Sequence, residues 1–402
     1  MPTSAASPQT DIATEKSVRL HYLDWLRVIA ILGVFLFHAL HPFDLADWHI
    51  KNAQTSFEVT LIYAFLAPWG MPFFFLIAGT GSWYALRRRT PREYACERFK
   101  RLCIPFICGV ILLAPLMLYL EWRHKTQTGI LEIPFSEFLA NRIPGFTPEW
   151  FGALGNHLWF LGFLFCFALL TLPLFSWLRG ESGKRIVSTM ARLIGQRGGF
   201  LLLVLPLVLV QFGLRPFFPD EHDWADFCYL MCFFVLGYVF CADERFGQAI
   251  RRDWWIALIG GVATFVAIAV MAISAEELNV PAAPLTLRDH AFWFLVTVNG
   301  VCWTVFFFFV GMRFLNFSNR WLQYGQEAVL PFFMLHQPVI MIIAFFVVLW
   351  DAGILVKLPV VLLGSFAATI GLYEVVIRRI APLRAVFGMA PKRQDRAQVA
   401  AG

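Results

Sequence analysis

Two ionisable side chains, Arg27 and His38, lie within the first apolar segment of the chain, LDWLRVIAILGVFLFHALHPFD. On a helix that turns 100° per residue they are only about 20° from sharing one face, and they are about 16 Å apart along the axis. Histidine has an ordinary pKa near 6.5, so it can take up and return a proton at neutral pH. We therefore interpret His38 as a candidate general base, with His41 one turn further as the alternative.

A structural role would account for the same residues. Arg27 would then extend its guanidinium to the aqueous interface, and His38 would only hydrogen-bond a neighbouring helix. Asp24 lies three residues before Arg27 and continues the same stripe. An ionisable stripe inside an apolar helix is energetically costly and indicates function. We expect a polar track from one edge of the segment to a histidine deep within it.

The composition of the chain places its helices in a membrane. Of the 402 residues, 59% are hydrophobic and only 15% are charged, whereas a soluble domain has about 25% charged residues. Stretches of roughly 20 apolar residues are long enough to cross the hydrocarbon core, and only helices satisfy their own backbone there. The sequence predicts an all-α polytopic membrane protein with about ten transmembrane helices, at residues 24–44, 58–86, 102–120, 156–178, 199–217, 225–242, 254–274, 290–312, 327–350 and 356–378.

The positions of lysine and arginine predict the orientation of these helices. If residues 87–101, 179–197, 243–253, 313–323 and both termini share one side, that side holds about 26 of the 33 basic residues. An excess of basic residues marks the cytoplasmic side. We expect cytoplasmic tails at 1–20 and 381–402 around a membrane domain at 21–380. The net charge of +6 then reflects the cytoplasmic loops, and no nucleic-acid partner is expected.

Six motifs in order resemble the acyltransferase-3 family of membrane acyltransferases. They begin with the spacing of Arg27 and His38 and continue with MPFFFLIAGTGSWYAL, the Arg98–Arg101 pair in ERFKRLCIP, NHLWFLGFLF, PFFMLHQPVI and LYEVVIRRIAPLRAVFG. Within the family, the residues of these motifs are most similar to those of the branch that succinylates osmoregulated periplasmic glucans. The second motif has Ala78 and Gly79 where the family has either Ser-Gly or Ala-Gly.

The resemblance implies transfer of an acyl group from cytoplasmic acyl-CoA, acetyl or succinyl, to a hydroxyl of a saccharide, glucan or lipid-linked acceptor outside a bacterial inner membrane. His38 would be the base, acting directly or through an acyl-histidine, and Arg27 would lie on the same track. The phosphates of CoA need cations, and the forked guanidinium groups of Arg98 and Arg101 would supply them with Arg27. The basic run Arg87–Arg89 could also contribute, but the positive-inside bias is the better explanation of it.

Four further residues are candidates for substrate contacts. His157 and Trp159 open the fourth predicted helix on the external side, where an acceptor could bond to the imidazole or stack on the indole. His336 precedes Pro338 in the ninth helix and could line an acyl channel, and Glu374 could pair with Arg27 or another cation. A satisfied hydrogen bond or ion pair is an equally good interpretation of each. We interpret Cys228 and Cys232 as small buried side chains and expect no metal.

A second class of function uses the same residues. A proton-coupled transporter could relay protons through Arg27, His38 and Glu374, since intramembrane histidines and carboxylates serve pumps as well as enzymes. A transporter has no need of an Arg-x-x-Arg cluster at the cytoplasmic side, which favours the acyltransferase.

Overall fold

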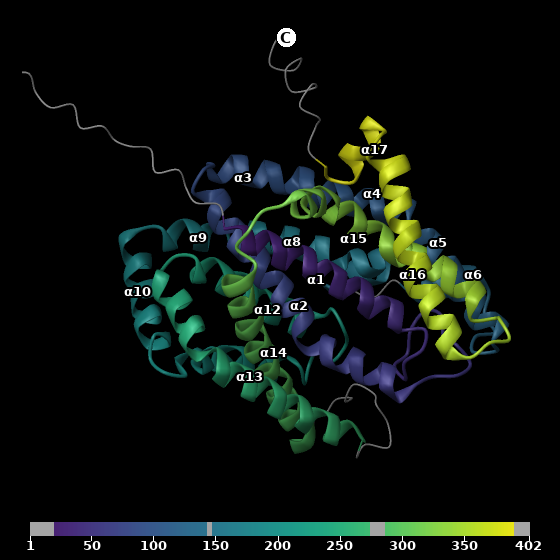
Figure 1. Cartoon of the computed structure of the whole chain (residues 1–402), viewed down its shortest axis with the longest axis horizontal. Coiled ribbons are helices and arrows are strands. Elements are labelled where there is room, and N and C mark those ends of the chain that lie inside the picture. Colours follow the sequence, from purple (N-terminus) through teal and green to yellow (C-terminus); the bar gives the residue numbers. More distant parts are fainter. Residues whose placement is uncertain (1–19, 143–146, 274–285, 390–402) are drawn as a thin grey trace, which may run out of the picture.

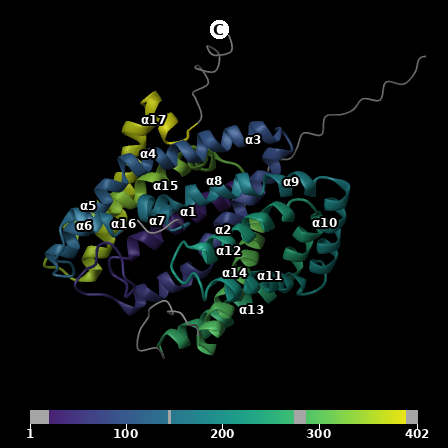
Figure 2. The same cartoon turned by 180° about the vertical axis from the view of Figure 1, so that it is seen from behind.

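The computed structural model describes residues 20–142, 147–273 and 286–389. Within these ranges every regular element is a helix and no strand forms. Figures 1 and 2 show the helices packed side by side, and α1 (His21–Leu40) packs against α2, α14, α15 and α16. Residues 1–19 and 390–402, which make up nearly all of the predicted N-terminal tail and much of the predicted C-terminal tail, lie outside the described residues.

Seven segments in the described ranges are long and apolar enough to cross a membrane. They comprise α1, α2 (Phe57–Leu86), α7 to α8 (Trp150–Gly155, Asn156–Leu158 as the 3₁₀ turn η2, and Trp159–Leu170), α13 (Glu244–Ile273), α14 (Leu287–Phe314), α15 (Arg320–Val347), and α16 (Ile354–Leu372) with the π-helical turn η4 (Tyr373–Ile377). α2 is helical throughout, so the two prolines inside it, Pro68 and Pro72, unwind no turn. The chain is therefore a multi-pass helical protein.

The other three predicted spans also coincide with helices, but they are bent or short. The segment from Pro91 to Gln127 bends by 42° between α4 and α5 and makes an eighth span if it is counted as one. The remaining two are the apolar stretches Gly199–Leu214 and Trp224–Phe240, which contain η3 (Gly199–Leu203), α11 (Val204–Leu214) and α12 (Trp224–Phe240). The described chain thus has seven or eight segments of spanning length where the sequence predicted ten.

Short helices connect these spans. They are α3 (Pro91–Arg98), the π-helical turn η1 (Phe99–Cys103), α4 (Ile104–Leu112), α5 (Ala114–Gln127), α6 (Phe135–Ala140), α9 (Leu172–Leu178), α10 (Glu181–Ile194) and α17 (Ala381–Val386). α17 lies within the predicted C-terminal tail, so helical structure continues past residue 380.

Segments that the charge pattern assigned to one side of the membrane contact one another. The indole Nε1 of Trp25, at the start of α1, donates to the carbonyl oxygen of Phe317 at 3.0 Å. Gly388 packs against the start of α4, where an added Cβ would lie 3.2 Å from the carbonyl oxygen of Arg101. The start of the described chain therefore lies beside the segment 313–323, and its end lies beside the segment 87–101.

The loop after α1 contacts the segments assigned to the opposite side. The backbone N–H of Lys51 donates to Nε2 of His124 in α5 at 3.1 Å. The ammonium group of Lys357 in α16 donates to Oδ1 of Asn52 at 2.9 Å. These bonds join the loop at 41–56 to both α5 and α16.

Backbone packing between α2 and α12 requires glycine on both helices. An added Cβ on Gly237 would lie 1.9 Å from the carbonyl oxygen of Leu76, and one on Gly79 would lie 1.9 Å from that of Phe234. No side chain fits in such a gap, because real Cβ contacts are longer than 3 Å. The two glycines therefore bring the two backbones together and fix the position of α2 beside α12.

We expect Gly237→Ala to destabilise the protein even though alanine normally favours a helix interior over glycine by about 1 kcal/mol. Overpacking of a closed contact costs about 1–3 kcal/mol or more, so the melting temperature of the purified protein in detergent should fall. Gly371→Ala in α16 is the matched control, because an added Cβ there meets nothing within 4 Å. A melting temperature for Gly237→Ala equal to that of the control would contradict this account of the α2–α12 contact.

Candidate active site

Three histidines that are far apart in the sequence meet where α1, η2 and α15 converge. The ring centroid of His38 is 5.2 Å from that of His336 and 6.5 Å from that of His157, and the rings of His157 and His336 are 5.1 Å apart. His157 and His336 are buried, with exposed fractions of 4% and 1%, whereas His38 is only partly buried. The sequence predicted each residue as a site candidate, and the structure brings these three together into a histidine cluster.

Pro338 leaves free a backbone carbonyl that holds His157 in place. Proline has no N–H, so the carbonyl of Met334, four residues earlier, receives no helical hydrogen bond from residue 338. Nε2 of His157 lies 3.2 Å from that oxygen and 3.1 Å from the oxygen of Phe333. Nδ1 of His336 lies 2.6 Å from the same Phe333 oxygen. Since carbonyls only accept, these two nitrogens carry the ring protons.

The position of the proton on each of these two rings determines whether the other ring nitrogen is a hydrogen-bond donor or acceptor. A neutral imidazole that donates from one nitrogen has an acceptor lone pair on the other. Nδ1 of His157 and Nε2 of His336 are buried and have no hydrogen-bond partner among the described residues, and the same is true of Nδ1 of His38. The cluster thus has two buried nitrogen atoms that can accept a proton, next to His38, the one residue of the three that is only partly buried.

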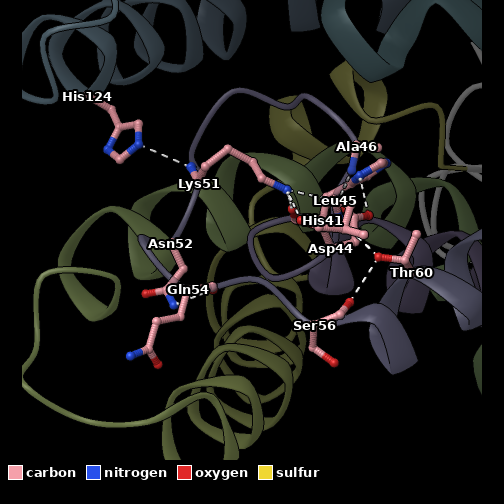
Figure 3. A network of polar contacts seen from close by, with 10 residues as sticks. All are labelled: His41, Asp44, Leu45, Ala46, Lys51, Asn52, Gln54, Ser56, Thr60 and His124. Atoms are coloured by element: carbon pink, nitrogen blue, oxygen red, sulfur yellow. Dashed lines mark hydrogen bonds and ion pairs between the residues drawn. The ribbon is translucent and has the colours of Figure 1, made fainter. Parts of the chain in front are cut away.

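The loop after α1 adds a charged network to the cluster, and sequence reasoning missed most of it. Figure 3 shows Lys51 reaching across the loop toward His41 and Asp44. The ammonium of Lys51 lies 2.8 Å from Oδ1 of Asp44 and also donates to the carbonyl oxygens of His41 and Asp44. Nδ1 of His41 lies 2.9 Å from Oδ2 of Asp44. The ring of His41 stacks on Trp48 at 5.5 Å and is 6.2 Å from that of His38.

Arg27 lies at the other end of α1. Its guanidinium is 3.4 Å from Oδ1 of Asp24, and it faces Gly81 of α2, where an added Cβ would be 3.7 Å from Nη2. Its side chain is 37% exposed. The unbroken helix of α1 carries both Arg27 and His38, but Arg27 contacts α2, whereas His38 contacts η2 and α15.

Arg98 and Arg101 meet around a carboxylate of their own helix. Thr90 caps α3 with a capping box closed by Glu93, and α3 ends at Arg98, where it passes into the wider turn η1. Oε1 of Glu97 lies 3.3 Å from Arg101, and Oε2 lies 3.7 Å from Arg98 and 3.6 Å from Arg89. This is an anion site already filled by a side chain, and Glu97 was not among the sequence candidates.

Tyr94 joins this arginine cluster to α2. The guanidinium of Arg98 lies over the ring of Tyr94 at 4.8 Å, and the hydroxyl of Tyr94 donates to that of Ser82 at 2.9 Å. Arg27 contacts the neighbouring position, Gly81. All three arginines predicted to bind the donor therefore lie near the same end of α2.

The other two candidates lie away from the histidine cluster. The ring centroid of Trp159 lies 4.2 Å from that of His222, with the two rings tilted by 40°. Burial lowers the pKa of His222, so this ring is neutral at pH 7. The carboxylate of Glu374 accepts two hydrogen bonds of 3.0 Å from Arg378 and pairs with that cation, not with Arg27.

Glu121 in α5 is the centre of a second charged network beside the loop. It is 2% exposed and contacts Nδ1 of His49 at 2.7 Å, Nζ of Lys125 at 3.0 Å and the guanidinium of Arg142. Its four groups lie on three separate segments. Among the described residues, no group of three or more His, Cys, Asp and Glu side chains could hold a metal ion.

Helices of spanning length around a buried imidazole cluster define a polytopic membrane protein with potential acid–base chemistry. Residues 20–374 match the acyltransferase domain family, so the chain belongs to the acyltransferase-3 family of membrane acyltransferases, as its motifs predicted. It is similar to glucans biosynthesis protein C of Salmonella typhimurium, with 22% identity over 401 residues, 95% of this chain and 98% of the relative. The protein of that name from Salmonella enteritidis is 22% identical over 396 residues, with the same coverage. No solved structure gives a significant match.

We expect Glu121→Gln to lower the stability of the protein, because it would leave the charges of Lys125 and Arg142 beside a buried neutral amide and remove the carboxylate from the ring of His49. Breaking a buried pair costs about 3–5 kcal/mol, and partial exposure of the partners reduces this to about 2 kcal/mol. Thermal unfolding of the purified protein measures the effect. Glu137→Gln, at an exposed position in the nearby α6, is the control. The interpretation of Glu121 is wrong if both variants unfold at the wild-type temperature.

Proposed function

We propose that this protein transfers an acyl group from cytoplasmic acyl-CoA to a hydroxyl of a saccharide or glucan outside the inner membrane, with His38 as general base. The observation that carries the proposal is the position of His38, a residue that is only partly buried, beside two buried imidazoles whose ring protons are held by backbone carbonyls. A hydroxyl is a poor nucleophile at neutral pH, and a positioned base accelerates its attack by about 10²–10⁴-fold.

The reaction needs one proton to move from the acceptor to the donor. His38 takes the proton of the acceptor hydroxyl as its oxygen attacks the thioester carbonyl. The carbon–sulfur bond then breaks, and the thiolate of CoA takes a proton back from the imidazolium. His157 and His336 lie close enough to His38 to act as substrate contacts beside it. His41, held by Asp44, is the alternative base.

The donor would bind at the end of α2 that Arg27, Arg98 and Arg101 share. Guanidinium groups bind phosphate through paired N–H donors, and CoA has a pyrophosphate and a further phosphate. Arg98 and Arg101 contact Glu97, so a phosphate has to displace this carboxylate. The acyl group would be acetyl or succinyl, and it has to extend along α1 to reach His38.

The topology we propose has ten spans with both termini in the cytoplasm, the two short helical segments at 199–214 and 224–240 included. Its support is the basic excess at 87–101 and 313–323 and the contact of those segments with the described chain ends. With this orientation the arginine cluster faces the cytoplasm, where acyl-CoA is made, and the His41 network faces outward.

A glucan acceptor is supported by the name of the curated relatives, glucans biosynthesis protein C. The outward loops offer polar side chains at 41–56, together with His222 over Trp159 as an aromatic surface on which a sugar ring can stack. Trp159 and Glu374 lie away from the base, so Trp159 would act in acceptor binding. Glu374 pairs with Arg378, which favours the transferase over a proton relay through Glu374.

We expect His38→Ala to reduce acyl transfer by at least about 10²-fold while acyl-CoA binding is retained, because the base is lost and the arginines are not. Transfer of radiolabelled acyl groups to envelope glycan, with binding measured separately on purified protein, tests both statements. His290→Gln is the control, since His290 bonds the backbone of Thr286 at the start of α14. Wild-type transfer by the His38→Ala protein would refute the assignment of the base.

We expect Glu97→Gln to bind CoA more tightly than the wild type, since the arginines no longer have to release a carboxylate. The pair of the partly buried Glu97 with the exposed Arg101 is equivalent to about 0.2–1 kcal/mol, or up to about fivefold in affinity. Arg98→Ala with Arg101→Ala should have the opposite effect. Calorimetry with CoA compares the three proteins, and Glu93→Gln on the same helix controls for loss of a negative charge. Weaker binding by Glu97→Gln would contradict the donor site.

A further inference from the structure

A second arginine-lined pocket lies at the edge of the molecule, between α10 and the first turns of α13. Its volume is about 440 Å³, and its polar lining consists of Arg192, Gln196, Arg245, Gln248 and Arg252. Figures 1 and 2 show α10 on the outer edge of the bundle, and none of the residues of the histidine cluster lines this space. The α10–α13 pocket is therefore a separate feature of the protein.

Two of the three arginines in this pocket are neutralised by carboxylates. Arg252 lies 2.7 Å from Oδ2 of Asp253 and donates to the carbonyl oxygens of Gly195 and Gln196 at 2.6 Å. Arg245 lies 2.7 Å from Oδ2 of Asp243. Both arginines are thereby fixed in position as parts of the pocket wall.

The third arginine has no such partner. Among the described residues no hydrogen bond or ion pair is made by the side chain of Arg192, which is exposed on the last turn of α10. The pocket therefore has three guanidinium groups against two carboxylates, and the five N–H donors of Arg192 are free. The chemistry that satisfies a forked donor of this kind is a planar or tetrahedral oxyanion, above all a phosphate.

The surroundings of the pocket suit a phosphate attached to a lipid. α13 continues from the pocket into an apolar span. Trp255 and Leu193 beside it are 40% and 48% exposed, and the guanidinium of Arg197 lies over the ring of Trp255 at 5.4 Å. Exposed tryptophan and arginine at the end of a span mark the level of the lipid headgroups, where basic pockets between helices bind anionic heads.

We propose that the α10–α13 pocket binds the phosphate group of an anionic ligand, with Arg192 as the side chain that the ligand satisfies. The headgroup of an anionic phospholipid is the source that the position of the pocket favours, and a soluble phosphate compound is the other. The proposal is independent of the acyl-transfer chemistry, because it involves neither His38 nor the arginines around Glu97.

The experiment uses the full-length protein and the variant Arg192→Gln. Native mass spectrometry measures how many phosphatidylglycerol molecules each protein retains, with phosphatidylcholine as the neutral comparison, and calorimetry measures binding of inorganic pyrophosphate. One lysine or arginine near an anionic surface contributes about 1 kcal/mol, so we expect about a fivefold loss of phosphatidylglycerol affinity and no change with phosphatidylcholine. Lys184→Gln removes a charge from the same helix outside the pocket and should leave binding unchanged.

The outcomes separate the two sources. Loss of phosphatidylglycerol binding alone supports a lipid headgroup, and loss of pyrophosphate binding alone supports a soluble phosphate ligand. Arg192 makes no contact that folding requires, so the melting temperature of Arg192→Gln should equal that of the wild type, and Arg192→Lys should restore part of the affinity. Unchanged binding of both probes by a folded Arg192→Gln protein would overturn the proposal.

Discussion

Two imidazoles share one backbone oxygen at the centre of this molecule, and the geometry of the whole cluster depends on that arrangement. The oxygen of Phe333 accepts from His157 and from His336, and Pro338 leaves the next carbonyl free for His157 as well. In an apolar interior a free carbonyl is costly unless a donor reaches it. The missing proline N–H therefore draws a histidine of η2 onto α15 and fixes which nitrogen of that histidine carries the proton.

α1 connects two regions with different electrostatic character. One end, with Arg27, lies beside a set of arginines arranged around Glu97. The other end has imidazoles and a loop in which Lys51 and Asp44 neutralise each other. Under the function proposed above, the separation along a single helix would place binding of an anionic donor and proton transfer at different depths of the protein. A substrate that uses both regions must be long and must lie along this helix.

The sequence was sufficient to predict the helical class and the family, and it named the three histidines that the structure brings together. Hydropathy is a local property, so it located a helix at each of the ten expected places. The spacing of Arg27 and His38 was likewise readable, because helical periodicity is regular. It could not predict that His38 would meet His157 and His336, since no periodicity relates residues on three separate segments.

The charged networks could not be predicted from the sequence either, for a different physical reason. A carboxylate such as Glu97 or Glu121 can pair with any cation that the fold brings near it, and only tertiary packing selects the partner. The two glycines between α2 and α12 show the same limit. Gly79 was noted for its place in a motif, but its role is to let a carbonyl of another helix approach its backbone. One sequence signal could have pointed to the loop network. It is the high density of ionisable residues at 41–54, which was not used.

The interlocked backbones of α2 and α12 have a mechanical consequence. With a carbonyl oxygen of each helix seated against a glycine of the other, neither helix can slide along its neighbour without a steric collision. α2 and α12 must therefore move as one rigid unit during any opening of the molecule. Entry and exit of substrates then require displacement at other interfaces, such as those of α1, α15 and α16, where side chains rather than main chains meet and can change rotamer.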